Sequence, residues 1–312
     1  MTRLITRRIV VSIIVLIVVS FITFVIQSFI PGDPARAILG TTGTPQQYTE
    51  LVKTLHLNEP VAIQYLQYMS HLLRGDLGSS LFNNESVASQ LLQRTPVTLS
   101  LLVPSTILLA AIGVVLGTLS VTAPRPIARI IDVFSLLGLA MPNFWLALLL
   151  VSGFAIAIPL FPAVGYTPLA SDPVAWAIGL ALPVVALTVA GVANVAKITR
   201  DGMLESLNSD YVRTLRASGF TSRSIVWKHG LRNSGISIIT ILGITFIGAL
   251  SGSVYVEDVF ALPGLGSLIV TATNQHDIPV IQGVALDFTL IVVVLNLITD
   301  VAYIMLNPKM RR

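Results

Sequence analysis

The sequence of 312 residues contains no cysteine and few charged side chains. Without cysteine, the chain forms no disulfide and offers no thiolate ligand to a metal ion. Charged residues make up 11% of the sequence, whereas a soluble globular domain carries about 25%. Apolar residues make up 54%, and the mean hydropathy is +0.84. This composition is typical of a protein whose helices lie in a membrane.

Short motifs of three common enzyme classes are also missing. The sequence has no G-x-x-x-x-G-K-[ST] phosphate-binding loop, no H-E-x-x-H zinc motif and no G-x-S-x-G nucleophile elbow. His229 and His276 are single histidines in predicted loops, and a metal site needs several ligands together. We therefore predict that this chain has no enzymatic activity and binds no metal or cofactor itself.

Six apolar runs are long enough to cross a membrane as helices. The hydrocarbon core is about 30 Å thick and a helix rises about 1.5 Å per residue, so about 20 apolar residues suffice. The first run is longer than the apolar part of a secretory signal, so we interpret it as a retained span. The third run contains Pro142 and Gly153 and is the least regular. The predicted spans are Ile9–Ile30, Pro96–Val121, Ile131–Ile158, Val174–Ala196, Gly235–Tyr255 and Val280–Leu306.

The lysines and arginines indicate the orientation of these spans. Six spans place both termini on one side, and that side with its loops holds 15 of the 19 basic residues. An excess of Lys and Arg marks the cytoplasmic side. We therefore place both termini and the loop 197–234 in the cytoplasm. The sequence pI of about 9.6 then reflects topology, and no binding of nucleic acid is expected.

Residues 31–95 form a segment outside the cytoplasm that is too long for a simple connection. Thr44 before Pro45 is typical of a helix start, and a second helix is expected after Pro60. Gly75 is expected to end that second helix. We predict a small helical subdomain whose main role is packing on the membrane part. The predicted division is 1–30 for the first span, 31–95 for this subdomain, 96–306 for a core of five spans, and 307–312 for a cytoplasmic tail.

A charged segment interrupts the apolar pattern between the fourth and fifth spans. Residues 208–233 read NSDYVRTLRASGFTSRSIVWKHGLRN. Asn208 or Ser209 can cap a helix that begins near Asp210, and Gly219 suits the positive φ of a helix end. Thr221 or Ser222 can cap a second helix. Composition leaves two interpretations open, an amphipathic helix on anionic lipid and a docking element for a cytoplasmic partner.

Polar residues in the last predicted span are costly to place in lipid. We predict that Asp287 faces a transport pathway or a partner subunit, and the alternative is a position near the outer interface. Asn296 is assigned to the same pathway or subunit contact. Asn296 and Asp300 are four residues apart and share one helix face. Asp300 lies near the cytoplasmic end, where a charged side chain can reach the interface.

The charged segment also carries a resemblance to a known family. RTLRASG at 213–219 and HGLRN at 229–233 resemble the cytoplasmic coupling-loop motif of bacterial ABC importer permeases, and more narrowly of dipeptide and oligopeptide permeases. The resemblance covers essentially the whole chain. Further segments that carry it are IPGDPA at 30–35, LLRGDLG at 72–78, EDVFALPGLG at 257–266, PVIQG at 279–283 and NPKMR at 307–311.

The resemblance implies an all-α type I ABC importer permease fold with six transmembrane helices and the extracytoplasmic helical subdomain. Such a permease translocates di- or oligopeptides, or a related solute such as heme, by alternating access. The implied partners are a second homologous permease, two ATPase subunits that bind ATP and magnesium, an extracytoplasmic substrate-binding protein, and membrane lipid. The implied location is the bacterial cytoplasmic (inner) membrane.

The resemblance also assigns roles to residues. The helix around 208–220 would sit in a groove of the ATPase and transmit its motion. Leu215 and Ser237 depart from the family pattern, which often has a small residue and a proline at these places. Glu257 and Asp258 are expected in the docking of the binding protein. The implied ATPase-docking residues are Tyr211, Arg213, Thr214, Leu215, Arg216, Ala217, Ser218, Gly219 and Phe220.

Three other readings remain open at this point. A secondary transporter driven by an ion gradient would need ionisable residues near the bilayer midplane, and Asp287 alone comes near. A membrane-integral assembly factor would need no transport pathway. A permease of the same family that carries nickel or another solute differs only in its cargo.

Overall fold

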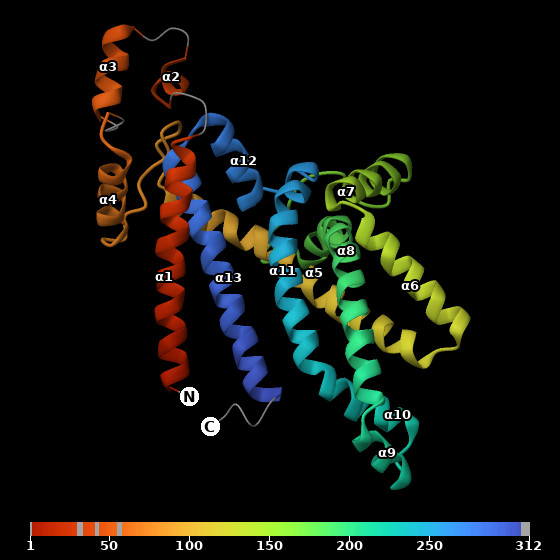
Figure 1. Cartoon of the computed structure of the whole chain (residues 1–312). Coiled ribbons are helices and arrows are strands. Elements are labelled where there is room, and N and C mark those ends of the chain that lie inside the picture. Colours follow the sequence, from red (N-terminus) through yellow and green to blue (C-terminus); the bar gives the residue numbers. More distant parts are fainter. Residues whose placement is uncertain (1, 30–33, 41–43, 55–57, 307–312) are drawn as a thin grey trace. The chain divides into compact units, whose positions relative to one another are not determined.

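The computed structural model describes residues 2–29, 34–40, 44–54 and 58–306, which form helices joined by loops (Figure 1). Within these ranges the only pairing of extended backbone is an isolated bridge between Ser79 and Ser86. The predicted tail 307–312 and residues 30–33 of the IPGDPA segment lie outside the described residues. The first helices are α1 (Thr2–Gln27), α2 (Pro34–Leu39), α3 (Pro45–Thr54), α4 (Val61–Leu72), α5 (Val87–Thr122), α6 (Arg125–Ala140) and α7 (Asn143–Val151). The later ones are η2 (Ser152–Ala157), α8 (Pro173–Leu207), α9 (Asp210–Ala217), α10 (Ser222–Ser224), η3 (Ile225–Gly230), α11 (Leu231–Val259), α12 (Leu265–Gln275) and α13 (Ile278–Leu306).

Five helical stretches in the described part of the chain are long and apolar enough to cross a membrane. They are Arg7–Gln27, Val87–Thr122, Pro173–Leu207, Ser222–Val259 and Ile278–Leu306. Four of the six predicted spans lie wholly within these stretches, and the first predicted span lies within them up to Gln27, so the all-α membrane fold is confirmed. α8 continues to Leu207, because the residues after Ala196 keep helix-forming side chains and no proline or glycine cap intervenes before Asn208.

The third predicted span, Ile131–Ile158, is not one continuous helix. α6 ends at Ala140, Met141 is extended with φ −91° and ψ 120°, and α7 begins at Asn143. Pro142 lacks a backbone N–H and disfavours the helical conformation of the residue before it, which accounts for the break. α7 continues into the π-helix η2, and together they form a shorter apolar helix over Asn143–Ala157. The break falls at Pro142, one of the two residues that made this predicted span the least regular.

The helices of the predicted outer segment begin and end where the sequence indicated. Thr44 accepts a hydrogen bond from the N–H of Gln47 at 3.3 Å, and Gln47 Oε1 accepts one from the N–H of Thr44 at 2.9 Å. This reciprocal pair is a capping box, and it fixes the start of α3. Gly75, with φ +81°, follows the end of α4 and ends the helix as predicted.

One compact unit of the chain contains residues 1–98 and 263–293. Within it, α4 packs on α1 through an aromatic cluster in which Tyr65 lies 5.2 Å from Phe21 and 5.6 Å from Phe24 between ring centroids. The loop after α4 is held by Asp277, a buried residue between α12 and α13. Its carboxylate accepts hydrogen bonds from Ser80 Oγ at 2.5 Å and from the N–H of Leu81 at 3.2 Å. These bonds fix the loop against the start of α13.

The second compact unit contains residues 99–262 and 294–312. α8 is its centre and packs against α6, α7 and α11. Small residues allow a close approach of α5 to α8, because a Cβ added at Gly117 would lie 2.5 Å from the carbonyl oxygen of Ala196. Such small-residue contacts are typical of helices that pack within membranes. The short helices α9 and α10 lie between the ends of α8 and α11, at one end of this unit (Figure 1).

Candidate coupling surface and polar sites of the membrane part

The charged segment between α8 and α11 is a compact helical turn, not an open loop. α9 spans Asp210–Ala217, α10 spans Ser222–Ser224, and the π-helix η3 leads into α11. Two apolar side chains, Val212 of α9 and Ile225 of η3, are buried. The turn therefore has its own small core, which holds its outer face in one conformation.

Hydrogen bonds tie α9 to both neighbouring helices. The hydroxyl of Tyr211 lies 2.5 Å from Oγ of Ser206, a buried residue in the last turn of α8. Asn233 of α11 donates its Nδ2–H to the same Oγ at 3.3 Å. One buried hydroxyl group therefore links α9 to α8 and α8 to α11.

The end of α9 has the geometry of a Schellman motif. The N–H of Phe220 donates to the carbonyl of Leu215 at 3.1 Å, and the N–H of Gly219 donates to the carbonyl of Arg216 at 3.1 Å. Gly219 has φ +81°, as the sequence predicted for this position. Thr221 accepts from the N–H of Ser224 and caps α10, also as predicted. Ser209 occupies the N-cap position of α9, but its hydroxyl donates to the carbonyl of Ser206 and does not cap the helix.

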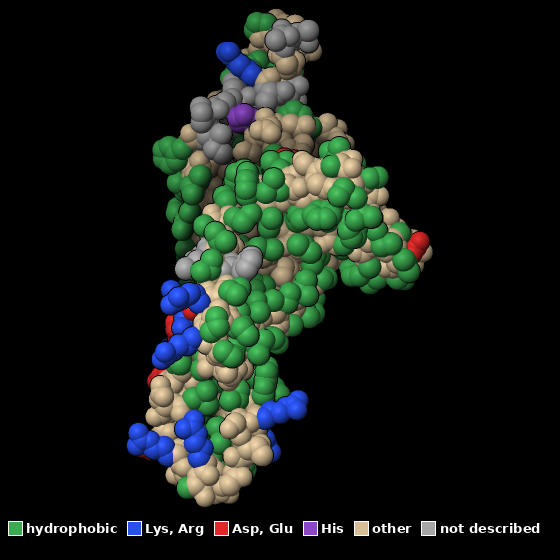
Figure 2. Space-filling model, turned by 90° about the vertical axis from the view of Figure 1, so that its right-hand side faces the viewer, with side chains coloured by type: hydrophobic (Ala, Val, Ile, Leu, Met, Phe, Trp, Pro, Cys, Tyr) green, Lys and Arg blue, Asp and Glu red, His purple; other side chains and the backbone are tan. Residues whose placement is uncertain are grey.

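The outer face of the turn is basic and partly aromatic. Arg213 and Arg216 are exposed, and Arg213 forms an ion pair with Asp210 at 3.4 Å between two exposed side chains. Such a pair contributes at most about 1 kcal/mol, so it leaves Arg213 free to exchange partners. Phe220 is exposed and packs edge-on against His229, with ring centroids 5.5 Å apart. Figure 2 shows Lys and Arg side chains gathered over the end of the molecule that α9 and α10 form.

The structure brings most of the predicted docking residues to this one surface. Leu215 is half-buried, whereas Tyr211 is exposed and uses its hydroxyl for the internal bond to Ser206. The other predicted residues are exposed, namely Arg213, Thr214, Arg216, Ala217, Ser218, Gly219 and Phe220.

The polar residues predicted in the last span fall in different environments. Asp287 is half-buried and hydrogen-bonded to the hydroxyl of Thr95 in α5, whose Oγ1 also lies 2.7 Å from the carbonyl oxygen of Leu91. Asn296 is exposed on α13. The structure thus gives Asp287 a polar partner within the first unit, whereas the side chain of Asn296 is available at a surface.

The two acidic residues predicted for docking outside the cytoplasm also differ. Glu257 is fully buried in the last turns of α11, whereas Asp258 is exposed. Of the two, only Asp258 has an exposed side chain. The alternation follows from the helix, because adjacent residues lie about 100° apart around its axis.

A cavity of about 310 Å³ lies among α7, α8 and α11 of the second unit. Its polar side chains include Asn143, Asn194 and Thr245, and Oγ1 of Thr245 is buried without a hydrogen-bond partner among the described residues. These residues were not predicted from the sequence. Two asparagines within apolar runs carry a signal that could have found them, because unpaired amides are costly in lipid.

The sequence matches two family descriptions that together cover the chain. Residues 86–312 match "Binding-protein-dependent transport system inner membrane component", and residues 1–102 match the N-terminal part of such membrane components. The chain belongs to this family of transport-system membrane components. The predicted resemblance is therefore confirmed, and so is a location in the inner membrane with several spans. The family places the chain beside a substrate-binding protein in a transport system.

Similar membrane components are found in several bacteria. The "Probable peptide ABC transporter permease protein y4tP" of Sinorhizobium fredii is 37% identical over 308 residues, 98% of each chain. The "Oligopeptide transport system permease protein AppB" of Bacillus subtilis is 36% identical over 99% of each chain. The "Dipeptide transport system permease protein DppB" of Alkalihalophilus pseudofirmus is 35% identical over 98% of each chain.

A solved structure shares the fold of this membrane component. It is described as "Inward facing conformations of the MetNI methionine ABC transporter", in its CY5 native crystal form. The TM-score is 0.58 at 20% identity, and the match covers 70% of this chain and 97% of the other. This likeness shows the fold alone, and it agrees with the expected type I importer architecture.

Proposed function

We propose that this chain is a permease subunit of an ATP-driven importer that carries di- or oligopeptides across the bacterial cytoplasmic membrane. Similarity along nearly the whole chain to membrane components named for peptide, oligopeptide and dipeptide transport supports peptides as the cargo. The chain itself catalyses no reaction in this proposal. ATP and magnesium bind to partner ATPase subunits, and this chain holds no cofactor.

The proposed assembly contains this chain, a second homologous permease, two ATPase subunits and a substrate-binding protein outside the cytoplasm. Both termini of this chain lie in the cytoplasm, because the sequence concentrates Lys and Arg on that side. The side that holds α9 then faces the ATPases. The exposed carboxylate of Asp258 lies on the outer side and contributes to docking of the binding protein.

The observation that carries the proposal is the construction of α9. Its outer face presents Arg213, Arg216 and Phe220, residue types that anchor protein interfaces. Its inner face is bonded through Tyr211 and Ser206 to α8. A helix that is exposed on one side and bonded to two spans on the other transmits a push from an ATPase to the membrane part.

A pathway for cargo is assigned to the polar sites of the membrane part. Asn143, Asn194 and Thr245 give one cavity the donors and acceptors that a peptide backbone needs. Asp287 and Asn296 of α13 are assigned to the pathway or to the contact with the second permease. Translocation follows from alternate opening of these helices toward each side of the membrane.

The test is isolation of the membrane complex from cells that carry this chain with an affinity tag. Wild type is expected to co-purify with ATPase subunits and to support uptake of labelled peptide that depends on ATP. Arg216→Glu is expected to lower both at least fivefold, because it reverses charge in the docking face. Arg74→Glu is the matched control, since Arg74 is also exposed but lies in the predicted outer segment.

Two outcomes contradict the proposal. If Arg216→Glu retains ATPase subunits and uptake at the control level, α9 is not the docking element. If uptake follows an ion gradient and continues without ATPase subunits, the chain is a secondary transporter.

A further inference from the structure

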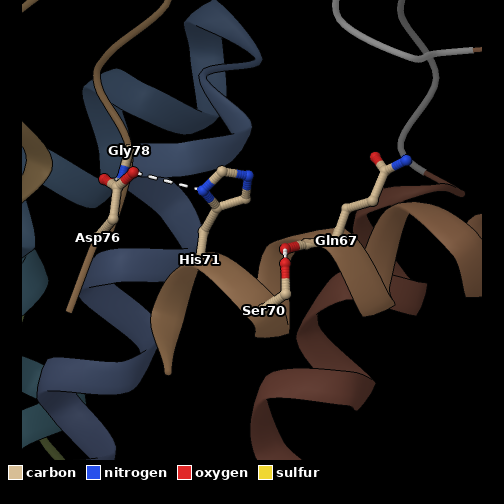
Figure 3. Close-up of polar contacts among 5 residues, drawn as sticks. All are labelled: Gln67, Ser70, His71, Asp76 and Gly78. Carbon is tan, nitrogen blue, oxygen red and sulfur yellow. Dashed lines mark hydrogen bonds and ion pairs between the residues drawn. The ribbon is translucent and has the colours of Figure 1, made fainter. Parts of the chain in front are cut away.

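A second, larger cavity of about 580 Å³ lies in the first compact unit, and none of the residues discussed above as candidate functional residues lines it. It is enclosed by the end of α1, the helix α4, the loop that follows α4, and the start of α13. Two segments that carried the family resemblance, at 72–78 and 279–283, contribute to its wall. Figure 3 shows the polar side of this cavity, where the end of α4 meets the loop.

One carboxylate is held in place at the cavity wall. Asp76 accepts a hydrogen bond from the N–H of Gly78 at 2.8 Å, and its other oxygen lies 3.4 Å from Nδ1 of His71 (Figure 3). Gly78 has φ +79°, which a glycine adopts without strain and which turns its N–H toward the carboxylate. Each carboxylate oxygen accepts more than one hydrogen bond, so Asp76 still has acceptor capacity for a ligand.

Two polar atoms of the lining have no hydrogen-bond partner among the described residues. They are the hydroxyl of Tyr68 and Oε1 of Gln282. Gln282 is only 1% exposed, and its Nε2 donates to Oε1 of Gln27 at 3.2 Å. Its amide oxygen Oε1 is therefore left without a hydrogen-bond donor. A buried polar group without a partner costs about 1–3 kcal/mol, which a ligand with matching groups would recover.

Aromatic rings line the same cavity. Phe24 and Tyr68 both contribute, and their ring centroids lie 6.0 Å apart. Aromatic faces attract cations, and the nearby carboxylate of Asp76 adds to that attraction. Burial, followed by the neighbouring Tyr65, raises the pKa of Tyr68 above its ordinary value, so its hydroxyl stays protonated and can donate. The lining thus combines a cation-attracting wall with a neutral hydroxyl donor.

The position of the cavity indicates that its ligand has an apolar part as well as a polar one. Phe24 stands in the last turn of the apolar helix α1, and Gln282 in the second turn of α13. Both helices are candidate spans, so the cavity lies at the level where they leave the membrane. Beside it, Phe21, Ile22 and Ile26 of α1 are 46%, 48% and 57% exposed. A ligand with long apolar chains can cover these side chains while its polar end occupies the cavity.

We propose that this cavity binds the head group of an aminophospholipid of the phosphatidylethanolamine type. The primary ammonium lies by Asp76 and the aromatic rings and donates to Oε1 of Gln282, while the phosphate accepts a hydrogen bond from Tyr68. The acyl chains lie along the exposed apolar face of α1. A quaternary ammonium has no N–H for Gln282, and a purely anionic head group is repelled by Asp76. This assignment goes beyond transport and is independent of the cargo.

The test uses the full chain in its membrane complex, reconstituted in nanodiscs and then analysed by native mass spectrometry for retained lipid. Discs contain phosphatidylethanolamine, phosphatidylcholine or phosphatidylglycerol with the same acyl chains. Wild type is expected to retain phosphatidylethanolamine about tenfold better than the other two lipids. Tyr68→Phe and Asp76→Asn are each expected to lower that preference at least threefold, whereas Tyr166→Phe, a matched loss of a hydroxyl in the other unit, leaves it unchanged.

Each variant is checked for folding by circular dichroism and by its retention of partner subunits, so loss of lipid is read only from folded protein. Equal retention of the three lipids by wild type would overturn the proposal. So would unchanged retention in both Tyr68→Phe and Asp76→Asn. If soluble phosphoethanolamine displaces the lipid as effectively as phosphatidylethanolamine vesicles do, the site takes a free amine and the lipid assignment is wrong.

Discussion

Tyr211, in the first turn of α9, is hydrogen-bonded to Ser206, in the last turn of α8, with 2.5 Å between their oxygens. This contact joins the surface proposed for ATPase docking to a helix that crosses the membrane. Because the Ser206 hydroxyl also accepts from Asn233, the same contact includes α11.

Tyr211→Phe removes this hydroxyl and keeps the ring. The loss of a hydrogen bond weakens the link by about 1 kcal/mol, which is about fivefold in an equilibrium constant. We expect peptide uptake to fall severalfold while ATP hydrolysis by the complex continues. Uptake and hydrolysis are measured together in proteoliposomes. Tyr255→Phe, which removes an exposed hydroxyl from α11, is the control, and equal uptake by both variants would contradict the prediction.

Gly219→Ala tests the end of α9. An added Cβ meets no atom within 4 Å, so the substitution acts through the positive φ alone. A left-handed conformation costs an alanine about 1–2 kcal/mol. We expect weaker co-purification of ATPase subunits with unchanged amounts of protein in the membrane. Gly248→Ala also meets no atom within 4 Å but lies in the helical conformation of α11, and it is expected to be neutral. If both variants bind ATPase alike, the conformation of Gly219 does not matter.

Gly117→Ala tests the packing of α5 on α8. The added Cβ would lie 2.5 Å from the carbonyl oxygen of Ala196, which belongs to a helix backbone and cannot rotate away. Overpacking of this kind costs about 1–3 kcal/mol, so we expect a lower temperature of thermal unfolding in detergent. Gly179→Ala on α8 has open space around it and serves as the control. A Gly117→Ala protein as stable as the control would show that the two helices separate readily.

Asp287→Leu removes the hydrogen bond to Thr95, whereas Asp287→Asn keeps a side chain that can donate and accept. We expect Leu to lower the free energy of unfolding by about 1–2 kcal/mol and Asn to have a smaller effect. In a Thr95→Val background the penalty of Leu is expected to shrink, since the partner is already absent. Chemical denaturation measures the four variants of this cycle. If Asp287→Leu lowers the free energy of unfolding equally with and without Thr95, the two side chains are not coupled.

We also predict that Tyr68→Phe changes how the stability of the folded protein depends on pH in the alkaline range. Burial raises the pKa of Tyr68 in the folded protein, so above the unfolded pKa of about 10 the unfolded chain loses its proton first. Stability contributed by this group is therefore complete below about pH 10 and is lost as the pH rises further. We expect the variant to lose less stability than wild type between neutral and strongly alkaline pH, measured by thermal unfolding. Parallel curves for the two proteins would contradict this.

Periodicity and local signals in the sequence are sufficient for much of the fold. Long apolar runs predict five of the six spans because a lipid environment demands continuous apolar side chains. Gly75, Gly219 and the Thr44 cap were predictable because each acts on its own backbone. Pro142 was visible in the sequence, but a proline inside a span produces either a kink or a break, and only tertiary packing decides which.

The polar sites depend on contacts that the sequence does not display. Tyr68 and Gln282 lie more than two hundred positions apart and line one cavity only in the folded chain. The pairing of Asp277 with Ser80 and the pairing of Asp287 with Thr95 likewise join distant segments. The docking residues of α9 were accessible to prediction because a single short motif contains them all, although the anchoring role of Ser206 was not.

The interruption at Met141 has a consequence for the solvation of the backbone. Because α7 starts at Asn143, its first backbone N–H groups have no hydrogen-bond partner within the helix. The last backbone carbonyl groups of α6 lack such partners for the same reason. Hydrocarbon cannot satisfy such groups. Because Asn143 also lines the smaller cavity, water or a polar solute in that cavity could satisfy these groups.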